Sequence, residues 1–235
     1  MKNLKKYLKL WPLSPRFKTM MILASFFMIL GIGLDITQFI ILPDTEGGAP
    51  VTLFSVFYML AGMFIMQCSM FLGMSQMVLT SPKKRRIFFT YPVVLTVLMN
   101  LCMYGIAVVI RVVGIQKNPE LTNIMGYTLL FAGGFTLQIG IFGGLTYKYY
   151  WASFISFLII WALGYSLLGN PMELEHNQMG TRVLEVIGKW SFTERAWIGF
   201  AMCLVGNVLL IFFTRLVYRA PISQYIFRTM ARKTV

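Results

Sequence analysis

Polar side chains occur inside otherwise apolar stretches of the sequence, and four of them are candidates for a substrate path. These four are Asp35, Gln38, Gln67 and Asn100. Because a charged or strongly polar group is costly in hydrocarbon, such residues tend to face the interior of a helix bundle or a water-filled cavity. We therefore expect Asp35 to line a substrate path through the membrane together with the other three, or else to reach the outer lipid headgroups from the end of its span.

The sequence contains no comparable motif for binding a metal ion or for hydrolysing a nucleotide. The single histidine, His176, lies near Glu173 and Glu175, but no HExxH or similar spacing of zinc ligands occurs. The pattern GxxxxGK[ST], whose loop cradles nucleotide phosphates, is absent from the sequence. No Ser, Cys or carboxylate nucleophile has a recognisable set of catalytic partner residues in the sequence. We therefore predict that the chain is not an enzyme by itself and carries no metal or cofactor.

The composition indicates a membrane protein. Hydrophobic residues make up 57% of the 235 residues and charged residues 12%, which is too little polar surface for a soluble globule. Crossing a hydrocarbon core about 30 Å thick takes roughly 20 helical residues, and no apolar stretch alternates like a barrel strand. We predict an all-α membrane protein with six transmembrane helices in one domain, residues 1–235. The predicted spans are residues 20–42, 51–79, 87–113, 124–147, 151–169 and 196–218.

Lys and Arg residues are unevenly divided between the two sides of these spans. With the amino terminus in the cytoplasm, the inner loops and termini carry all but five of the 21 Lys and Arg residues. Cytoplasmic loops are enriched in cations, so this bias predicts that both termini are cytoplasmic. The net charge of +13 then indicates contact with anionic membrane lipids and not with nucleic acid. The five outer cations are Arg111, Lys117, Arg182, Lys189 and Arg195.

The amino-terminal segment, residues 1–18, is amphipathic. Its apolar residues recur at i, i+3, i+4 and i+7, and lysines occupy the remaining face. This pattern is typical of a helix that lies in the membrane interface, and Pro12 and Pro15 would end it. The alternative is a basic flank that only orients the first span. The residues of the expected apolar face are Leu4, Tyr7, Leu8 and Trp11.

A cationic loop, residues 80–86, separates the second and third predicted spans. Pro82 favours a sharp break, and the four consecutive cations hold the loop at the cytoplasmic surface. The loop either forms a brief surface helix on which a soluble partner acts, or is a topological signal only. Its residues from the serine onward are Ser81, Pro82, Lys83, Lys84, Arg85 and Arg86.

The longest outer segment, residues 170–195, also contains an amphipathic helical pattern. Its apolar side includes Val183, Leu184, Ile187 and Trp190, which predicts a helix at the outer membrane surface. The sequence from Ser191 to Glu194 has the form of a capping box before the last span.

Small residues recur in the fourth predicted span. Gly126, Gly133 and Gly140 lie seven residues apart, and Gly140 and Gly144 form a GxxxG pair. Such spacing predicts close packing inside the bundle. The cysteines Cys68, Cys102 and Cys203 lie inside spans and lack CxxC spacing, so we expect small buried apolar residues.

Taken together, these features resemble a compact type-2 ABC exporter permease over essentially the whole chain. Residues 79–90, Leu-Thr-Ser-Pro-Lys-Lys-Arg-Arg-Ile-Phe-Phe-Thr, are similar to the corresponding loop in small permeases of Gram-positive bacteria. These include permeases that export phenol-soluble modulins and permeases that give lantibiotic self-protection. The resemblance implies a multi-pass protein of the bacterial plasma membrane.

The resemblance further implies that two permease chains, identical or different, pair across a central path. Each would dock a separate ATP-binding subunit, which carries the ATP and Mg²⁺. Residues 81–86 would be the coupling helix, the amino-terminal helix would contact the same subunit, and residues 180–190 would form part of the outer gate. The Met- and Phe-rich composition suits amphipathic peptides or other hydrophobic cargo, because Met repacks easily. The alternatives are a lipid-acting membrane enzyme without an ATPase partner and an integral membrane immunity or assembly protein.

Overall fold

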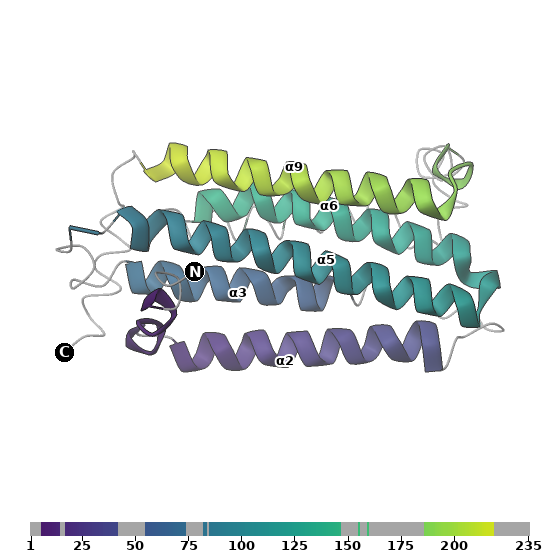
Figure 1. Cartoon of the computed structure of the whole chain (residues 1–235), viewed down its shortest axis with the longest axis horizontal. Coiled ribbons are helices and arrows are strands. Elements are labelled where there is room, and N and C mark those ends of the chain that lie inside the picture. The colour runs from purple at the N-terminus through teal and green to yellow at the C-terminus, as the bar shows by residue number, and fades with distance from the viewer. Residues whose placement is uncertain are drawn as a thin grey trace.

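The computed structural model describes residues 6–14, 17–41, 55–73, 82–83, 85–146, 155, 159 and 186–218. Within these ranges every regular element is a helix, and the long helices lie side by side in an elongated bundle (Figure 1). Short helical turns precede or connect them: η1 (Trp11–Leu13), η3 (Arg86–Thr90) and η4 (Pro119–Leu121). The long helices are α2 (Phe17–Ile36, continued by the π-helical η2, Thr37–Ile41), α3 (Ser55–Gly73), α5 (Tyr91–Lys117), α6 (Thr122–Thr146) and α9 (Phe192–Tyr218).

Four of the described helical stretches are long and apolar enough to cross a membrane. They coincide with the predicted spans 20–42, 87–113, 124–147 and 196–218, while α3 occupies part of the predicted span 51–79. The predicted span 151–169 lies outside the described residues, apart from Ile155 and Ile159. The four stretches are Phe17–Ile41, Tyr91–Lys117, Pro119–Gly143 and Phe192–Val217.

Local sequence signals set several helix ends. Pro92 lies in the first turn of α5, where a missing backbone N–H is tolerated. At the start of α9 the backbone N–H of Glu194 donates to the Ser191 hydroxyl over 3.3 Å, and the backbone N–H of Ser191 donates to the Glu194 carboxylate over 2.6 Å. The capping box is thereby confirmed.

Apolar side chains cover the outside of the bundle and polar side chains lie within it. Ile22, Ile29 and Val208 are each more than 60% exposed, whereas Asp35 and Arg111 are fully buried. This distribution is the reverse of that in a soluble protein and fits a bundle surrounded by lipid. Further buried polar residues are Thr96, Asn100, Thr128, Thr136, Arg195, Asn207 and Thr214.

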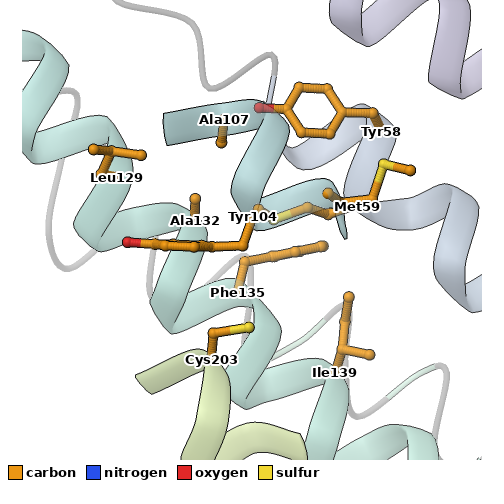
Figure 2. Packing of buried hydrophobic residues seen from close by; sticks show 10 residues of the cluster. Tyr58, Met59, Tyr104, Ala107, Leu129, Ala132, Phe135, Ile139 and Cys203 are labelled. Atoms are coloured by element: carbon orange, nitrogen blue, oxygen red, sulfur yellow. The ribbon is translucent and has the colours of Figure 1, made fainter. Parts of the chain in front are cut away.

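The main core joins α3, α5, α6 and α9. Tyr104 of α5 lies between Met59 of α3 and Ala132 of α6, and Phe135 extends the same layer toward Cys203 of α9 (Figure 2). Cys68 and Cys203 are buried as predicted, but the prediction is wrong for Cys102, which is exposed on the outer face of α5. Helix α5 has an exposed face at this position, which the sequence spacing of the cysteines did not reveal.

Helices α6 and α9 run parallel and pack along most of their length (Figure 1). A Cβ atom added at Gly133 would come within 3.0 Å of the Gly199 backbone, and one added at Gly140 would come within 3.0 Å of the Gly206 backbone. Real Cβ atoms do not approach so closely, so the helices touch through backbone atoms. The predicted role of the glycine repeat in internal packing is confirmed.

The helix directions place the described cations mainly at one end. Helices α2 and α5 begin there and α3, α6 and α9 finish there (Figure 1). We call this the basic end and its opposite the far end. The described acids Asp35, Glu120 and Glu194 belong to the far half of the bundle. The exposed cations of the basic end are Lys6, Lys9, Lys18, Lys83, Arg85, Arg86 and Arg215.

Candidate functional site

A buried ion pair joins α2 to α5 in the far half of the bundle. The Arg111 Nη2 group donates to Asp35 Oδ1 over 3.0 Å, and Nη1 donates to Asp35 Oδ2. Both side chains have no exposed surface. A two-bond guanidinium–carboxylate contact is the geometry in which this pair is strongest, so the two charges compensate each other inside the membrane.

Further contacts tie this ion pair to two more helices. The Tyr58 hydroxyl of α3 donates to Asp35 Oδ2 over 3.0 Å, and Arg111 Nε donates to the Thr128 hydroxyl of α6 over 3.1 Å. The guanidinium also lies 4.9 Å from the centre of the Phe39 ring. Arg111 therefore holds together the far halves of α2, α3, α5 and α6.

The structure tests one of the two alternatives predicted for Asp35, a position in a substrate path or at the outer headgroups. Since its carboxylate is fully buried against Arg111, the prediction that it reaches the outer headgroups is wrong. Burial and pairing place it inside the bundle, with both carboxylate oxygens engaged by Arg111 or Tyr58. Whether it meets cargo stays a prediction.

Of the other three residues of the expected path, Asn100 lies away from Asp35. Gln38 follows Asp35 by one turn, and its Oε1 atom is buried without a hydrogen-bond partner among the described residues. Asn100 donates to Asn207 Oδ1 of α9 over 2.9 Å, about 16 Å along α5 from Arg111 at 1.5 Å per residue. The side chain of Gln67 lies outside the described residues.

Arg111 is the functional residue that the sequence interpretation missed, because it was counted as an outer cation. The signal was available: Asp35 and Arg111 each lie near the far end of an apolar stretch, and an intramembrane charge is expected to have a partner of opposite sign.

At the basic end, the amino-terminal segment folds back onto the bundle. Tyr7 and Trp11 are buried against Leu72 of α3, and the cluster extends to Ile87 and Tyr91. The Tyr7 and Tyr91 rings lie 5.0 Å apart. The predicted apolar face is thus divided: Tyr7 and Trp11 come together, Leu8 is exposed, and Leu4 lies outside the described residues.

The cationic loop lies beside this cluster. Pro82 and Lys83 form an exposed turn, and Arg85 and Arg86 are exposed where the chain enters η3. The expected separate surface helix is not found among the described residues, because η3 continues directly into α5. Ser81 and Lys84 lie outside the described residues. Because the amino-terminal segment and the start of α5 pack together, we call their exposed cations Lys6, Lys9, Arg85 and Arg86 the continuous basic surface.

Arg195 organises the far end. Its Nε donates to the Ile187 carbonyl over 3.1 Å, its Nη2 to the Gly188 carbonyl over 3.0 Å, and its Nη1 to the Asn123 carbonyl over 2.9 Å. The guanidinium lies 4.4 Å from the centre of the Tyr127 ring. Arg195 thus clamps the outer segment to α6.

The expected outer gate is described only in part. Ile187 and Trp190 are half-buried, and Ile187 is held through its carbonyl by Arg195. Val183 and Leu184 lie outside the described residues.

Replacing Arg195 with lysine should release this clamp. Lys keeps the charge but cannot reach three carbonyls in a fixed fork, so we expect faster proteolytic cleavage near residues 186–190 in the purified protein. Lys189→Arg, at an exposed position of the same segment, is the matched control and should leave the cleavage rate unchanged. Equal rates for all three proteins would contradict the clamp.

Comparisons with protein-family models, with curated proteins and with solved structures found no match for this chain. Within the described residues, no group of three His, Cys, Asp or Glu side chains comes together that could hold a metal ion. The fold is a helical bundle in which four of the described helical stretches are long and apolar enough to cross a membrane, which is compatible with a membrane-embedded protein.

Proposed function

We propose that this chain is the permease subunit of an ATP-driven ABC exporter for amphipathic peptides or other hydrophobic cargo. A separate ATP-binding subunit, carrying ATP and Mg²⁺, would supply the energy. A second permease chain would complete the path. The basic end would face the cytoplasm of a bacterial cell, in keeping with the bias of Lys and Arg toward that side.

The observation that carries the proposal is the continuous basic surface. Trp11 and Ile87 are 76 residues apart in sequence, yet Trp11 and Tyr7 pack with Ile87 and Tyr91, which lie just after the cationic loop. A soluble subunit that binds there would contact both segments at once. Movement of that subunit would be transmitted directly into α5, because η3 leads into it without a break.

The parallel arrangement of α6 and α9 supports the six-span count. Helix α6 finishes at the basic end and α9 begins at the far end (Figure 1). The chain must therefore pass from one end of the bundle to the other between them. The apolar stretch at residues 151–169 is long enough for that crossing at 1.5 Å per residue.

Neutralising Arg85 and Arg86 should weaken docking of the ATP-binding subunit. We expect Arg85→Gln with Arg86→Gln to reduce the amount of an ATP-binding subunit that co-purifies from the native membrane by about tenfold, because each exposed ion pair contributes up to about 1 kcal/mol and two are lost. Quantitative mass spectrometry of the affinity-purified complex measures the ratio of the two subunits.

The matched control is Lys117→Gln with Lys189→Gln, which removes two exposed cations at the far end. This control should leave the subunit ratio unchanged. Because cations also orient membrane proteins, labelling of engineered cysteines must show the same topology in both variants. Undiminished recovery of the ATP-binding subunit from the correctly inserted Arg85 and Arg86 variant would rule out this docking surface.

Transport itself is tested in vesicles that contain the chain and its ATP-binding subunit. We expect amphipathic peptides to stimulate ATP hydrolysis and to be moved across the vesicle membrane in an ATP-dependent manner. If peptides neither stimulate ATP hydrolysis nor cross the vesicle membrane, the proposal of peptide export is wrong. Turnover of a lipid by the purified chain alone would favour a membrane enzyme instead.

A further inference from the structure

The basic end contains a buried donor, the indole N–H of Trp11. The indole Nε1–H of Trp11 is enclosed by the protein and has no hydrogen-bond partner among the described residues, while the whole side chain is 7% exposed. A buried N–H group without an acceptor destabilises the folded state. An acceptor from outside the chain would remove that penalty.

The charged residues near Trp11 favour an acceptor with a negative charge. Lys9 and Lys6 precede it by two and five residues, and both are exposed. Arg86 is exposed directly before Ile87, which packs against the Trp11 cluster. The described carboxylates, Asp35, Glu120 and Glu194, all belong to the far half of the bundle. Among the described residues, the field around Trp11 is therefore positive.

The position of Trp11 relative to the apolar bundle indicates which anion could reach it. Trp11 begins η1, the short turn that precedes α2, and its ring meets Tyr7 edge to face with the centroids 6.3 Å apart. Trp and Tyr at a membrane boundary have an apolar body in the acyl region and a polar edge at headgroup depth. The anion found at this depth is the phosphate of a lipid headgroup.

We propose that Trp11 Nε1–H, Lys6, Lys9 and Arg86 form a binding site for the phosphate of an anionic phospholipid headgroup. The indole donates one hydrogen bond to a phosphate oxygen, and the three cations neutralise the charge. Because the N–H is enclosed, binding requires a local shift of the residues that cover it. The site shares Arg86 with the proposed docking surface, but binding of lipid to the purified chain requires no ATP-binding subunit.

Trp11→Phe tests this site because it keeps an aromatic ring and removes the indole N–H donor, together with part of the ring volume. If Trp11 has a packing role alone, the smaller ring lowers stability and leaves lipid binding unchanged. If it donates to a phosphate, affinity for short-chain phosphatidylglycerol falls by about tenfold. The measurement is a calorimetric titration of the purified full chain in detergent. Trp197→Phe, at an exposed position of α9, is the matched control and should bind like the unchanged protein.

Lys6→Gln with Lys9→Gln provides a second variant at exposed positions, where folding is not at risk. We expect several-fold weaker binding and a smaller dependence on salt concentration, whereas Lys117→Gln at the far end should have no effect. Unchanged affinity in both Trp11→Phe and the double lysine variant would overturn the proposal.

Two further probes distinguish the source of the phosphate. Short-chain phosphatidylcholine, whose headgroup has no net charge, should bind more weakly than phosphatidylglycerol. Inorganic phosphate should bind much more weakly than either lipid, because it lacks the acyl chains. Binding of inorganic phosphate as tight as that of phosphatidylglycerol, with the same loss in Trp11→Phe, would show a free-anion site and overturn the assignment to lipid.

Discussion

Replacing Asp35 with asparagine is expected to lower the thermal unfolding temperature of the purified protein more than any other single polar substitution in the bundle. The change keeps the shape of the side chain but leaves the Arg111 guanidinium buried and without a counter-charge. Breaking a buried pair in this way costs about 3–5 kcal/mol. Thermal unfolding in detergent, followed by intrinsic fluorescence, measures the effect.

A double variant distinguishes two effects: the loss of the whole ion pair, and the burial of one charge without its partner. Asp35→Leu with Arg111→Met removes both charges and fills the space with apolar side chains, so we expect it to be more stable than Asp35→Asn. Thr37→Val, which loses only a hydrogen bond to the Gly33 carbonyl one turn away, controls for a polar change on the same helix. An Asp35→Asn protein as stable as this control would show that the ion pair does not form.

Gly133→Ala is the second substitution with a large expected effect. The new Cβ would meet the Gly199 backbone within 3.0 Å, and backbone atoms cannot rotate away as a flexible side chain can. The helices α6 and α9 must therefore separate. We expect a loss of stability above the 1–3 kcal/mol or so that is common for overpacking, measured by thermal unfolding in the same detergent.

The neighbouring residue offers a matched control. A Cβ added at Gly134 has no atom within 4 Å, so Gly134→Ala should change stability by no more than about 0.5 kcal/mol. The two variants share the same chemical change, helix and depth. Equal stabilities for the alanine variants at residues 133 and 134 would contradict close contact between α6 and α9 at Gly199.

The sequence was sufficient to predict the features that depend on neighbouring residues along the chain. Long apolar stretches determine the helices, the Ser191 to Glu194 pattern determines a helix start, and the regular spacing of Gly126, Gly133 and Gly140 determines one close-packed face. Each of these signals is complete within about 20 residues. No knowledge of the other helices is needed to read them.

Pairing between helices could not be predicted in the same way. Arg111 meets Asp35, and Asn100 meets Asn207, only because each helix has a particular rotation about its axis. That rotation is fixed by packing of the whole bundle. The same reason explains why Leu8 is exposed although Tyr7 and Trp11 are buried, since a single short segment presents several apolar residues and the bundle covers only some of them.

Backbone contact between α6 and α9 has a mechanical consequence. Two helices that touch at Gly133 and Gly199 and again at Gly140 and Gly206 have no side-chain layer between them in which to slide. We therefore expect α6 and α9 to move as one rigid pair, and α2 with α3 forms a second close pair. Opening of the bundle would then tilt the α6–α9 pair relative to the α2–α3 pair across α5. That movement would break the contacts of Arg111 with Asp35 of α2 or with Thr128 of α6.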